Sequence, residues 1–209
     1  MFTGIVQGSF PLLAIERKPG LISLVIELSA ELVEGLEIGA SVSTDGVCLT
    51  VTAVTGQQVF FDVMQQTLSL TTLGQLSVGD YVNIERSAKQ GVEVGGHIIS
   101  GHVDGVAEVV NIKQPENNYF ITYRAPAEKM KYIFSKGFVG LNGCSLTVAE
   151  VDKAEHTFTV CYIPETLRVT THGKKKVGDV VNFEIDRQTQ AIVDTVENFL
   201  TDNPALLQK

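Results

Sequence analysis

One stretch of seven residues occurs twice in this chain, and the repeat limits the folds that it can adopt. Residues 45–51 read DGVCLTV, and residues 142–148 read NGCSLTV, 97 positions later. Residues 3–8 (TGIVQG) match residues 100–105 (SGHVDG) at the same interval. Two later pairs, TTLG with TTHG and VGDYVN with VGDVVN, are 99 positions apart, so the second copy is expected to carry two extra residues in the turn near Asp152. Self-similarity over this distance indicates a duplicated domain and not a solenoid.

The repeat divides the 209 residues into two domains, 1–97 and 98–187, and a C-terminal segment, 188–209. A net charge of −8 argues against nucleic acid or an anionic membrane as the main partner. Three cysteines at unpatterned spacing, and a start that does not resemble a signal peptide, favour a reduced, cytoplasmic compartment. No apolar run approaches the roughly 18 residues that a membrane-spanning helix needs.

Most of the chain has the pattern of short β-strands. Residues 21–28 and 48–53 alternate between apolar and polar side chains, and Gly56 marks a hairpin turn after the second of these stretches. The second copy repeats the pattern, and short helices are expected at 30–34 and 127–134. Short strands at regular spacing, with turns between them, indicate an all-β barrel or sandwich.

The C-terminal segment differs from both copies. Apolar residues recur at helical spacing over 188–200, and Ile192, Val196 and Phe199 form a stripe along one side of the predicted helix. The first copy is followed by no such helix. The stripe either packs on its own barrel or mediates self-association, and the pattern leaves both interpretations open.

The usual catalytic motifs are missing. There is no nucleophile elbow, phosphate loop or dinucleotide fingerprint, and the glycine-rich stretch 91–101 is interpreted as a linker between the domains. His97 and His102 are five residues apart, which places them on different faces of a strand or helix, so no metal site is predicted. The lysines at 174–176 are interpreted as a solvated turn.

The most informative positions are those at which the two copies carry different residues. These pairs are Cys48 with Ser145, Ile5 with His102, Gln7 with Asp104, and Gln65 with Pro164. Strand alternation places Cys48 on one face with Thr50, as it places Ser145 with Thr147. Taken alone, Cys48 would be a small buried apolar residue and His102 a structural one, but a matched serine needs a polar partner if buried. The set favours two similar pockets that bind similar ligands and offer different chemistry.

The sequence resembles the riboflavin synthase family over nearly the whole chain, to about Leu200. The resemblance rests on MFTGIV at the start, GVCLTV from Gly46, GGH from Gly95 through SGHVDG, and IPETL from Ile163. It implies two tandem six-stranded Greek-key barrels, a C-terminal helix and a homotrimer. It also implies a transferase that dismutates two molecules of 6,7-dimethyl-8-ribityllumazine per site, with no metal or organic cofactor. One molecule passes a four-carbon unit to the other, which gives riboflavin and 5-amino-6-ribitylamino-pyrimidinedione.

The resemblance also implies which residues form the site. The residues near the reacting rings would be Phe2, Ser41, Cys48 and His102. The substrate-binding residues of the first copy would be Gly4, Ile5, Val6, Cys48, Leu49, Thr50, Asp62, Val63, Met64, Gln65, Gln66 and Thr67. Those of the second copy would be Gly101, His102, Val103, Lys136, Ser145, Leu146, Thr147, Cys161, Tyr162, Ile163, Pro164, Glu165 and Thr166. Each set of matched segments is expected to build one pocket. By their patterns alone, Phe2 would belong to the core and Ser41 to a loop.

The implied reaction begins when an acidified ring methyl loses a proton and attacks the other ring. Catalysis would then come mainly from holding two rings face to face, with proton transfer by His102, Cys48 or a bound water as a smaller factor. Each site is expected to be shared between two chains of the trimer, and lumazine synthase is a candidate partner. Two other functions are considered: a non-catalytic lumazine- or flavin-binding protein of the same fold, and a purely structural trimerisation module.

Overall fold

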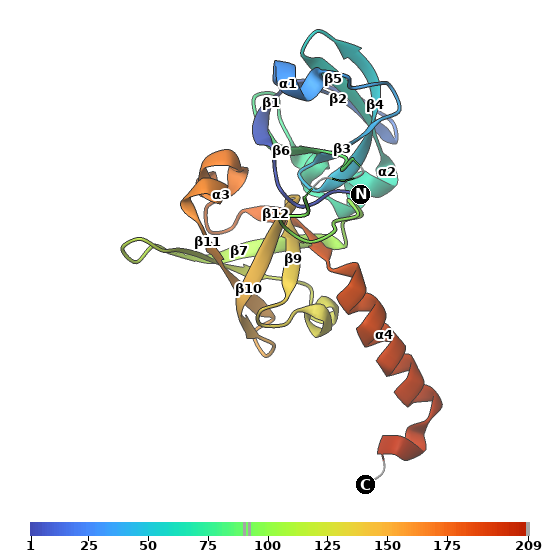
Figure 1. The fold of residues 1–209 in the computed structure, drawn as a ribbon, viewed down its shortest axis with the longest axis vertical. Helices are drawn as coiled ribbons and strands as arrows, with labels where there is room; N and C mark the ends of the chain where they lie inside the picture. The colour runs from blue at the N-terminus through green and yellow to red at the C-terminus, as the bar shows by residue number, and fades with distance from the viewer. Residues whose placement is uncertain (90, 92, 208–209) are drawn as a thin grey trace.

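The computed structural model describes residues 1–89, 91 and 93–207, so the last two positions of the predicted C-terminal segment lie outside the described residues. Two closed six-stranded antiparallel barrels follow one another along the chain (Figure 1). The first consists of β1 (Gly8–Lys18), β2 (Leu21–Glu27), β3 (Ser41–Thr44), β4 (Val47–Thr55), β5 (Gln58–Met64) and β6 (Tyr81–Arg86). The second consists of β7 (Gly105–Lys113), β8 (Tyr119–Arg124), β9 (Phe138–Leu141), β10 (Cys144–Asp152), β11 (Thr157–Tyr162) and β12 (Val180–Ile185).

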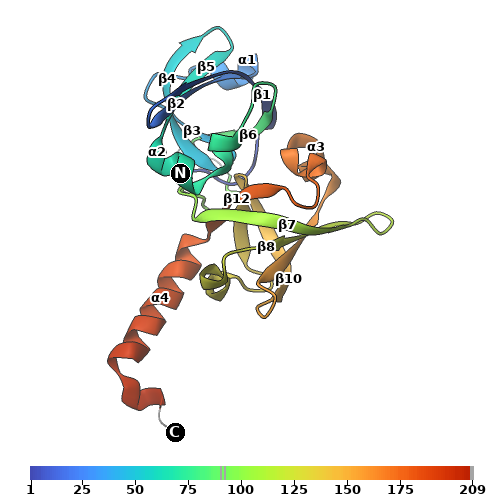
Figure 2. The same cartoon turned by 180° about the vertical axis from the view of Figure 1, so that it is seen from behind.

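Both barrels have the same strand order, which is β1-β2-β5-β4-β3-β6 in the first and β7-β8-β11-β10-β9-β12 in the second. In each, the second strand pairs with the fifth and the third pairs with the sixth, which is Greek-key connectivity. The strands of the first barrel form a closed ring around its interior in Figure 2. The predicted fold class is therefore confirmed.

Short helices connect the strands. They are α1 (Ala30–Val33), α2 (Gln65–Leu70), α3 (Pro164–Val169) and the 3₁₀ helices η1 (Thr72–Gln75), η2 (Ala127–Tyr132) and η3 (Thr171–Lys174). The helix expected at 30–34 is α1, where the Ser29 hydroxyl accepts the Leu32 N–H at the first turn. The helix expected at 127–134 is shorter and 3₁₀ in form. It ends at Tyr132 because Ile133 becomes extended and buries its side chain in the second core.

The two extra residues of the second copy lie in the predicted turn. Two residues, Gly56 and Gln57, connect β4 to β5, whereas four residues, 153–156, connect β10 to β11. The Asp152 carboxylate accepts the N–H groups of Ala154 and Glu155 at 3.0 and 3.1 Å, which stabilises the longer turn. The insertion thus changes a hairpin at the surface and leaves the barrel intact.

The barrel interiors differ in polarity. The first core consists of aliphatic side chains with Phe61. The second contains Tyr123, Tyr162 and His172, all buried, with 2.6 Å between the two tyrosine hydroxyls and 3.2 Å from the Tyr162 hydroxyl to His172 Nδ1. His172 Nε2 lies 3.1 Å from the Leu141 carbonyl oxygen, so each ring nitrogen has a partner. The matched positions in the first barrel hold Ile26, Val63 and Leu73.

A pseudo-twofold set of hydrogen bonds joins the barrels. The Asn83 amide donates to the Asn142 carbonyl at 3.0 Å, and the matched Asn182 amide donates to the Asp45 carbonyl at 2.8 Å. Each asparagine side-chain oxygen also accepts a backbone N–H from the 3₁₀ helix of the opposite barrel, at 2.7 Å in both cases. The repeated VGDxVN motif therefore supplies the connection between the domains.

The centre of this interface is tightly packed backbone. A Cβ atom added to Gly46 would lie 2.6 Å from the Gly143 nitrogen, and both glycines have positive φ. Lys174 belongs to a stretch interpreted as a solvated turn, but its Nζ lies 4.4 Å from the ring centroid of Tyr81 in the other barrel. The two domains thus pack closely through glycine, asparagine and a cation–π contact.

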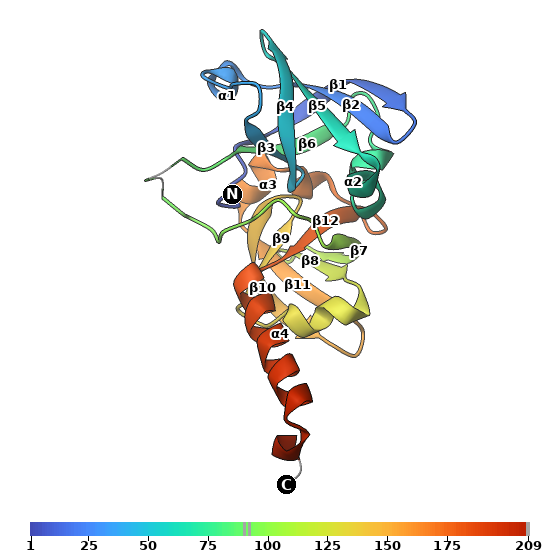
Figure 3. The same cartoon turned by 90° about the vertical axis from the view of Figure 1, so that its right-hand side faces the viewer.

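The C-terminal helix α4 (Arg187–Asp202) is present as predicted and is followed by η4 (Pro204–Leu207). Its first turns lie beside the second barrel, where Val193 packs against the core, and its C-terminal end extends beyond that barrel in Figures 1 and 3. Lys131 pairs with Asp194 and Glu197, while Ile192, Val196 and Phe199 are 66%, 51% and 56% exposed. The predicted stripe therefore does not pack on its own barrel. No helix of the described chain combines the length and apolarity required to cross a membrane.

Candidate functional site

Cys48 and Ser145 lie on the outer faces of their barrels. Along β4, Val47, Leu49 and Val51 are buried, while Cys48 and Thr50 face outward; β10 repeats the pattern around Ser145 and Thr147. This confirms the prediction that the two residues of each pair share a face. Leu49 and Leu146, two of the expected binding residues, have their side chains in the cores, so only their backbones are available to a ligand.

The segments beside these two residues are exchanged between the barrels. The Cys48 N–H donates to the Gly101 carbonyl at 2.9 Å, and the Ser145 N–H donates to the Gly4 carbonyl at 2.8 Å. The predicted grouping of Gly4, Ile5 and Val6 with the Cys48 pocket is therefore wrong. The N-terminal segment completes the second cluster, and residues 101–103 complete the first. The exchange arises because the two segments pair across the pseudo-twofold interface, with Phe2 bridged to Ile99.

Two buried glutamates hold the exchanged segments. Glu85 accepts the Thr3 N–H, the Thr3 hydroxyl and the Gly4 N–H at 2.6, 2.7 and 3.0 Å. The matched Glu184 accepts the same three groups from residues 100 and 101 at 2.8, 2.7 and 3.0 Å. Burial raises the pKa of both carboxyls, and the hydrogen bonds oppose that shift. Sequence reasoning missed these glutamates, although each follows the matched VGDxVN motif by two residues.

The glycines at the exchange points are required by space and conformation. Gly4 and Gly101 have φ values of +75° and +82°. A Cβ at Gly4 would lie 2.4 Å from Ser145 Cβ, and a Cβ at Gly101 would lie 2.6 Å from Cys48 Cβ. Only glycine allows the backbone to pass this close to Ser145 and Cys48.

The first cluster combines Cys48, Thr50, Ser41 and His102. Ser41 begins β3 and pairs with Thr50 across the sheet, so its predicted loop position is wrong. His102 follows Gly101 and is exposed, with its backbone N–H donating to Ser100 Oγ at 3.1 Å. Its carbonyl accepts from Arg187, the first residue of α4.

Two further residues of the first cluster have their side chains turned inward. Phe2 is only 1% exposed and lies beneath Gly101, as its pattern alone predicted. Val103 is partly buried against the first core. Their backbones border the cluster, and their side chains support it from below.

The ends of β5 and β11 supply the other expected binding segments. In the first barrel, Asp62 and Met64 face outward and Val63 inward, and the Ser23 hydroxyl donates to Asp62 at 2.6 Å. Gln65, Gln66 and Thr67 then form the first turn of α2. In the second barrel, the outward residues are Cys161 and Ile163, and α3 begins with Pro164, Glu165 and Thr166. The Tyr162 hydroxyl is committed to the core, so this residue can offer a ligand only its backbone.

The second cluster contains a contact that sequence reasoning did not anticipate. His97, considered only as a metal ligand, donates its backbone N–H to Ser145 Oγ at 3.1 Å and places Nδ1 2.6 Å from the same oxygen. Its ring stacks on Phe138, the residue matched to Ser41, with centroids 5.1 Å apart. Burial lowers the pKa of His97, and Asp186 partly opposes this. Lys136, which was expected to belong to this pocket, has a left-handed backbone conformation, and its N–H donates to the Val148 carbonyl at 2.8 Å. The sequence signal that could have located His97 was the GGH stretch at residues 95–97.

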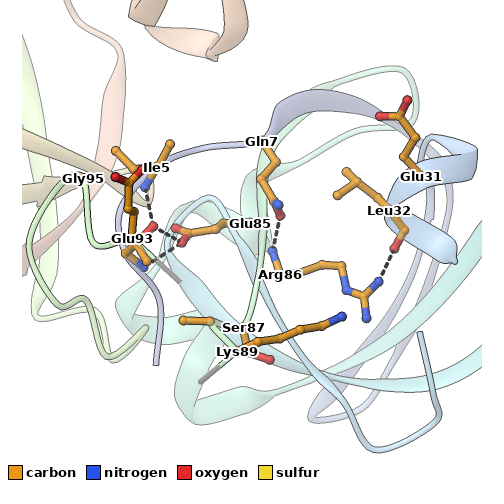
Figure 4. Close-up of a pocket in the computed structure, with 12 residues that line it drawn as sticks. Ile5, Gln7, Glu31, Leu32, Glu85, Arg86, Ser87, Lys89, Glu93 and Gly95 are labelled. Carbon is orange, nitrogen blue, oxygen red and sulfur yellow. Dashed lines mark hydrogen bonds between the residues drawn. The ribbon is translucent and has the colours of Figure 1, made fainter. Parts of the chain in front are cut away.

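A cavity of about 560 Å³ lies beside the N-terminal segment on the first-barrel side (Figure 4). Ile5 and Gln7 line it, and Arg86 lies across it with its guanidinium bonded to the Leu32 and Glu34 carbonyls at 3.2 and 2.7 Å. Neither Cys48 nor Ser145 lines this cavity, but Ile5 of the N-terminal segment does, so the cavity borders the second cluster without including its serine. Across residues 1–89, 91 and 93–207, no group of three or more His, Cys, Asp or Glu side chains is placed to hold a metal.

The two halves match one family. Residues 3–87 and 100–186 each match the lumazine binding domain. The chain is 53% identical to riboflavin synthase of Escherichia coli (strain K12) over 201 residues, 96% of this chain and 93% of that protein. It is 44% identical to riboflavin synthase of Chlamydia pneumoniae over 203 residues, 97% and 98% of the two chains. The fold and the matched clusters define a protein of two lumazine-binding domains. The chain belongs to the riboflavin synthase family.

Solved structures agree with this assignment. LumP complexed with riboflavin superposes with a TM-score of 0.83 at 29% identity, covering 90% of this chain and 100% of LumP. LumP complexed with 6,7-dimethyl-8-(1'-D-ribityl) lumazine gives a TM-score of 0.79, also at 29% identity, covering 88% and 98%.

Proposed function

We propose that this chain is a transferase that dismutates two molecules of 6,7-dimethyl-8-ribityllumazine to riboflavin and 5-amino-6-ribitylamino-pyrimidinedione. The observation that carries the proposal is the pair of pseudo-symmetric outer-face clusters at Cys48 and Ser145. A reaction between two copies of one substrate needs two pockets of similar shape. Because one copy donates a four-carbon unit and the other accepts it, those pockets need different chemical groups at matched positions.

Within each pocket, the polar outer face and the exchanged backbone segment would hold one lumazine. In the first, Thr50, Ser41 and the peptide groups of residues 101–103 surround Cys48. In the second, Thr147, Lys136 and the peptide groups of residues 4–6 surround Ser145. Holding two rings together supplies most of the rate increase, since well-oriented reactants gain several kcal/mol over free encounter. Proton transfer by His102, Cys48 or a bound water adds a smaller factor.

A complete site would be shared between two chains of a homotrimer. The packed contact of Gly46 with Gly143 fills the space at the pseudo-twofold axis, so the two clusters of one chain lack room there to close on each other. A first cluster would instead meet the second cluster of a neighbouring chain, which would also exclude water from the reacting rings. The exposed stripe on α4 would provide the trimer contact. The proposal also includes that the protein resides in the cytoplasm and that it associates with lumazine synthase.

A non-catalytic lumazine- or flavin-binding role is the second candidate, and the similarity to LumP in complex with both compounds favours it. Both clusters of this chain carry polar groups. A catalyst that acts on two bound lumazines needs such groups in both clusters, whereas a protein that binds one ligand needs them in only one. A purely structural trimerisation module would leave these groups without a role.

One assay separates the three functions. The protein is incubated with 6,7-dimethyl-8-ribityllumazine while riboflavin absorbance is followed, and binding is measured in parallel by fluorescence. The proposed enzyme forms one riboflavin for every two lumazines consumed. Tight binding without formation of riboflavin would identify the binding protein. If neither binding nor riboflavin formation is detected, only the structural role remains.

A further inference from the structure

The His102 carbonyl has a side-chain partner that the matched Ile5 carbonyl lacks. It accepts a hydrogen bond from the Arg187 guanidinium. In the described part of the chain, no donor bonds the Ile5 carbonyl. The residue matched to Arg187, 99 positions earlier, is Ala88, whose side chain has no donor. The contact is therefore made in the second copy and has no counterpart in the first.

Asp104 holds the Arg187 guanidinium in place. Its Oδ1 accepts a hydrogen bond from Arg187 Nη1 at 3.1 Å, and its Oδ2 accepts the Ile185 N–H at 2.9 Å. The Asp104 side chain is only 10% exposed, and Lys129 Nζ lies 3.8 Å from its Oδ1. Arg187 Nη1 also donates to Gln190 Oε1 at 2.7 Å. Hydrogen bonds between charged groups are strong when partly buried, so the guanidinium has a fixed position beside the carbonyl that it binds.

The first copy shows how little of this arrangement the barrel itself requires. Gln7, which matches Asp104, accepts the Arg86 N–H at 2.7 Å, as Asp104 accepts the matched Ile185 N–H. A neutral amide is therefore sufficient to close the barrel at this position. The negative charge of Asp104 and the guanidinium of Arg187 are additions of the second copy, and what they add is the contact with the peptide group beside the first pocket.

The His102 imidazole depends on its backbone for its position. The ring is exposed, and in the part of the chain that the structure describes no hydrogen bond reaches its nitrogens. The His102 N–H donates to Ser100 Oγ at 3.1 Å, and the Gly101 carbonyl accepts the Cys48 N–H at 2.9 Å. Glycine is the most flexible residue, so Gly101 by itself restrains the following peptide group little. The Arg187 contact supplies that restraint.

We propose, on the basis of the function above, that Arg187 is a positioning residue that fixes the His102 backbone and thereby directs the imidazole toward the lumazine of the first pocket. A proton-transfer group must lie within hydrogen-bond reach of the proton that it moves. Without the contact, the pocket still forms and binds its ligand, but the imidazole occupies the productive position less often. Arg187 is also the first residue of α4, so one side chain joins this helix to the first pocket.

The first test gives position 187 the residue of the first copy. Alanine is favourable in a helix, so Arg187→Ala should keep α4 and sediment like the parent protein. We expect kcat to fall by about tenfold, because small misplacements of a reacting group are costly, while KM changes by less than about threefold. Arg187→Lys keeps the charge but not the planar fork, and should give an intermediate kcat. A full kcat in Arg187→Ala overturns the proposal. Arg124→Ala, which breaks an exposed ion pair with Glu108, is the matched control and should keep full activity.

The second test asks whether Arg187 acts through the imidazole. His102→Gln removes the ring and leaves the backbone carbonyl in place. In that background, Arg187→Ala should cause no further loss of kcat, since the group that it positions is already absent. Losses that multiply in the double variant mean that Arg187 acts by another route, which also overturns the proposal.

The last measurement needs no turnover. The chain has four histidines, so NMR of the intact protein with carbon-13-labelled histidine gives a small set of ring resonances. Arg187→Ala should shift and broaden the His102 resonance and leave that of His156, which lies in an exposed turn, unchanged. An unchanged His102 resonance overturns the proposal at any level of activity. A protein that forms no riboflavin but shows this change refutes the proposed function and confirms the Arg187 contact.

Discussion

The two barrels share a fold, a strand order and an exchanged segment, yet they differ in polarity at two matched places. On the outer face, the first barrel has a thiol residue whose backbone N–H bonds to the Gly101 carbonyl, and the second has a hydroxyl bonded to an imidazole. Inside, the first core is aliphatic and the second contains two tyrosines and a histidine. The comparison indicates that the two copies of a duplicated β-barrel keep the same backbone contacts. Their side chains differ at positions where the backbone contacts do not require a particular side chain.

The largest expected effect tests whether the two unlike clusters work together across chains. Cys48→Trp blocks the first cluster and Ser145→Trp the second, so each variant alone should be nearly inactive. Co-refolded mixtures should regain activity, because about a quarter of the sites would pair two intact clusters by random assortment. Riboflavin formation in the mixture is the measurement. No gain in mixtures that mass spectrometry shows to be mixed trimers would place the whole site in one chain.

The next prediction concerns the feature that only the second barrel carries, its C-terminal helix. Val196→Asp with Phe199→Asp puts two charges on the exposed stripe and should yield monomers with folded barrels, since buried unpaired charges oppose association. Removal of residues 188–209 should do the same. Analytical ultracentrifugation reports the mass, and Asn198→Asp on the polar side is the control. A truncated chain that still sediments as a trimer refutes the role of α4.

A smaller effect is expected from placing the same residue at the two matched positions, 48 and 145. Cys48→Ser gives the first cluster the hydroxyl of the second, but without an imidazole beside it. Because a hydroxyl loses its proton far less readily than a thiol, turnover should fall by about tenfold while the fold is retained. Steady-state kinetics across pH is the measurement, with circular dichroism as the control. Unchanged kinetics at every pH would make Cys48 a packing residue.

The smallest expected effect concerns the two cores. Burial lowers the pKa of His172 to about 4, below the ordinary 6.5, so the unfolded chain binds a proton that the folded barrel excludes. Stability from this group is therefore present above pH 6.5 and is lost as the pH falls toward 4, by about 1–2 kcal/mol at pH 5. Tyr123→Phe with Tyr162→Phe and His172→Leu makes the core apolar at similar ring volume.

That apolar variant should lose the acid sensitivity. The measurement is the difference in unfolding free energy between variant and parent at pH 7 and pH 5. Taking this difference cancels the contributions of the other buried acids, Asp45, Glu85 and Glu184. A difference that does not change with pH would show that His172 plays no part in acid stability.

The sequence by itself determined the parts of this protein that depend on local pattern. Strand alternation placed Cys48 on one face with Thr50, as it placed Ser145 with Thr147, and helical spacing located α4. The interval between repeats located two extra residues in one turn. These features follow from periodicities of two and 3.6 residues and from self-similarity, all of which can be read along the chain. The family resemblance added the substrate and the Greek-key barrels.

Only the tertiary structure decided which segment serves which barrel. Gly4 lies beside Ser145 and Gly101 beside Cys48, although the repeat had assigned each to its own copy. His97 reaches Ser145 across 48 positions of sequence, and Ser41 becomes part of a strand through its pairing with Thr50. Local pattern specifies the face of a strand on which a side chain lies, but it carries no information about the partner that approaches that face. Those partners depend on long-range packing at the pseudo-twofold interface, where glycine backbones and two buried glutamates hold the exchanged segments in place.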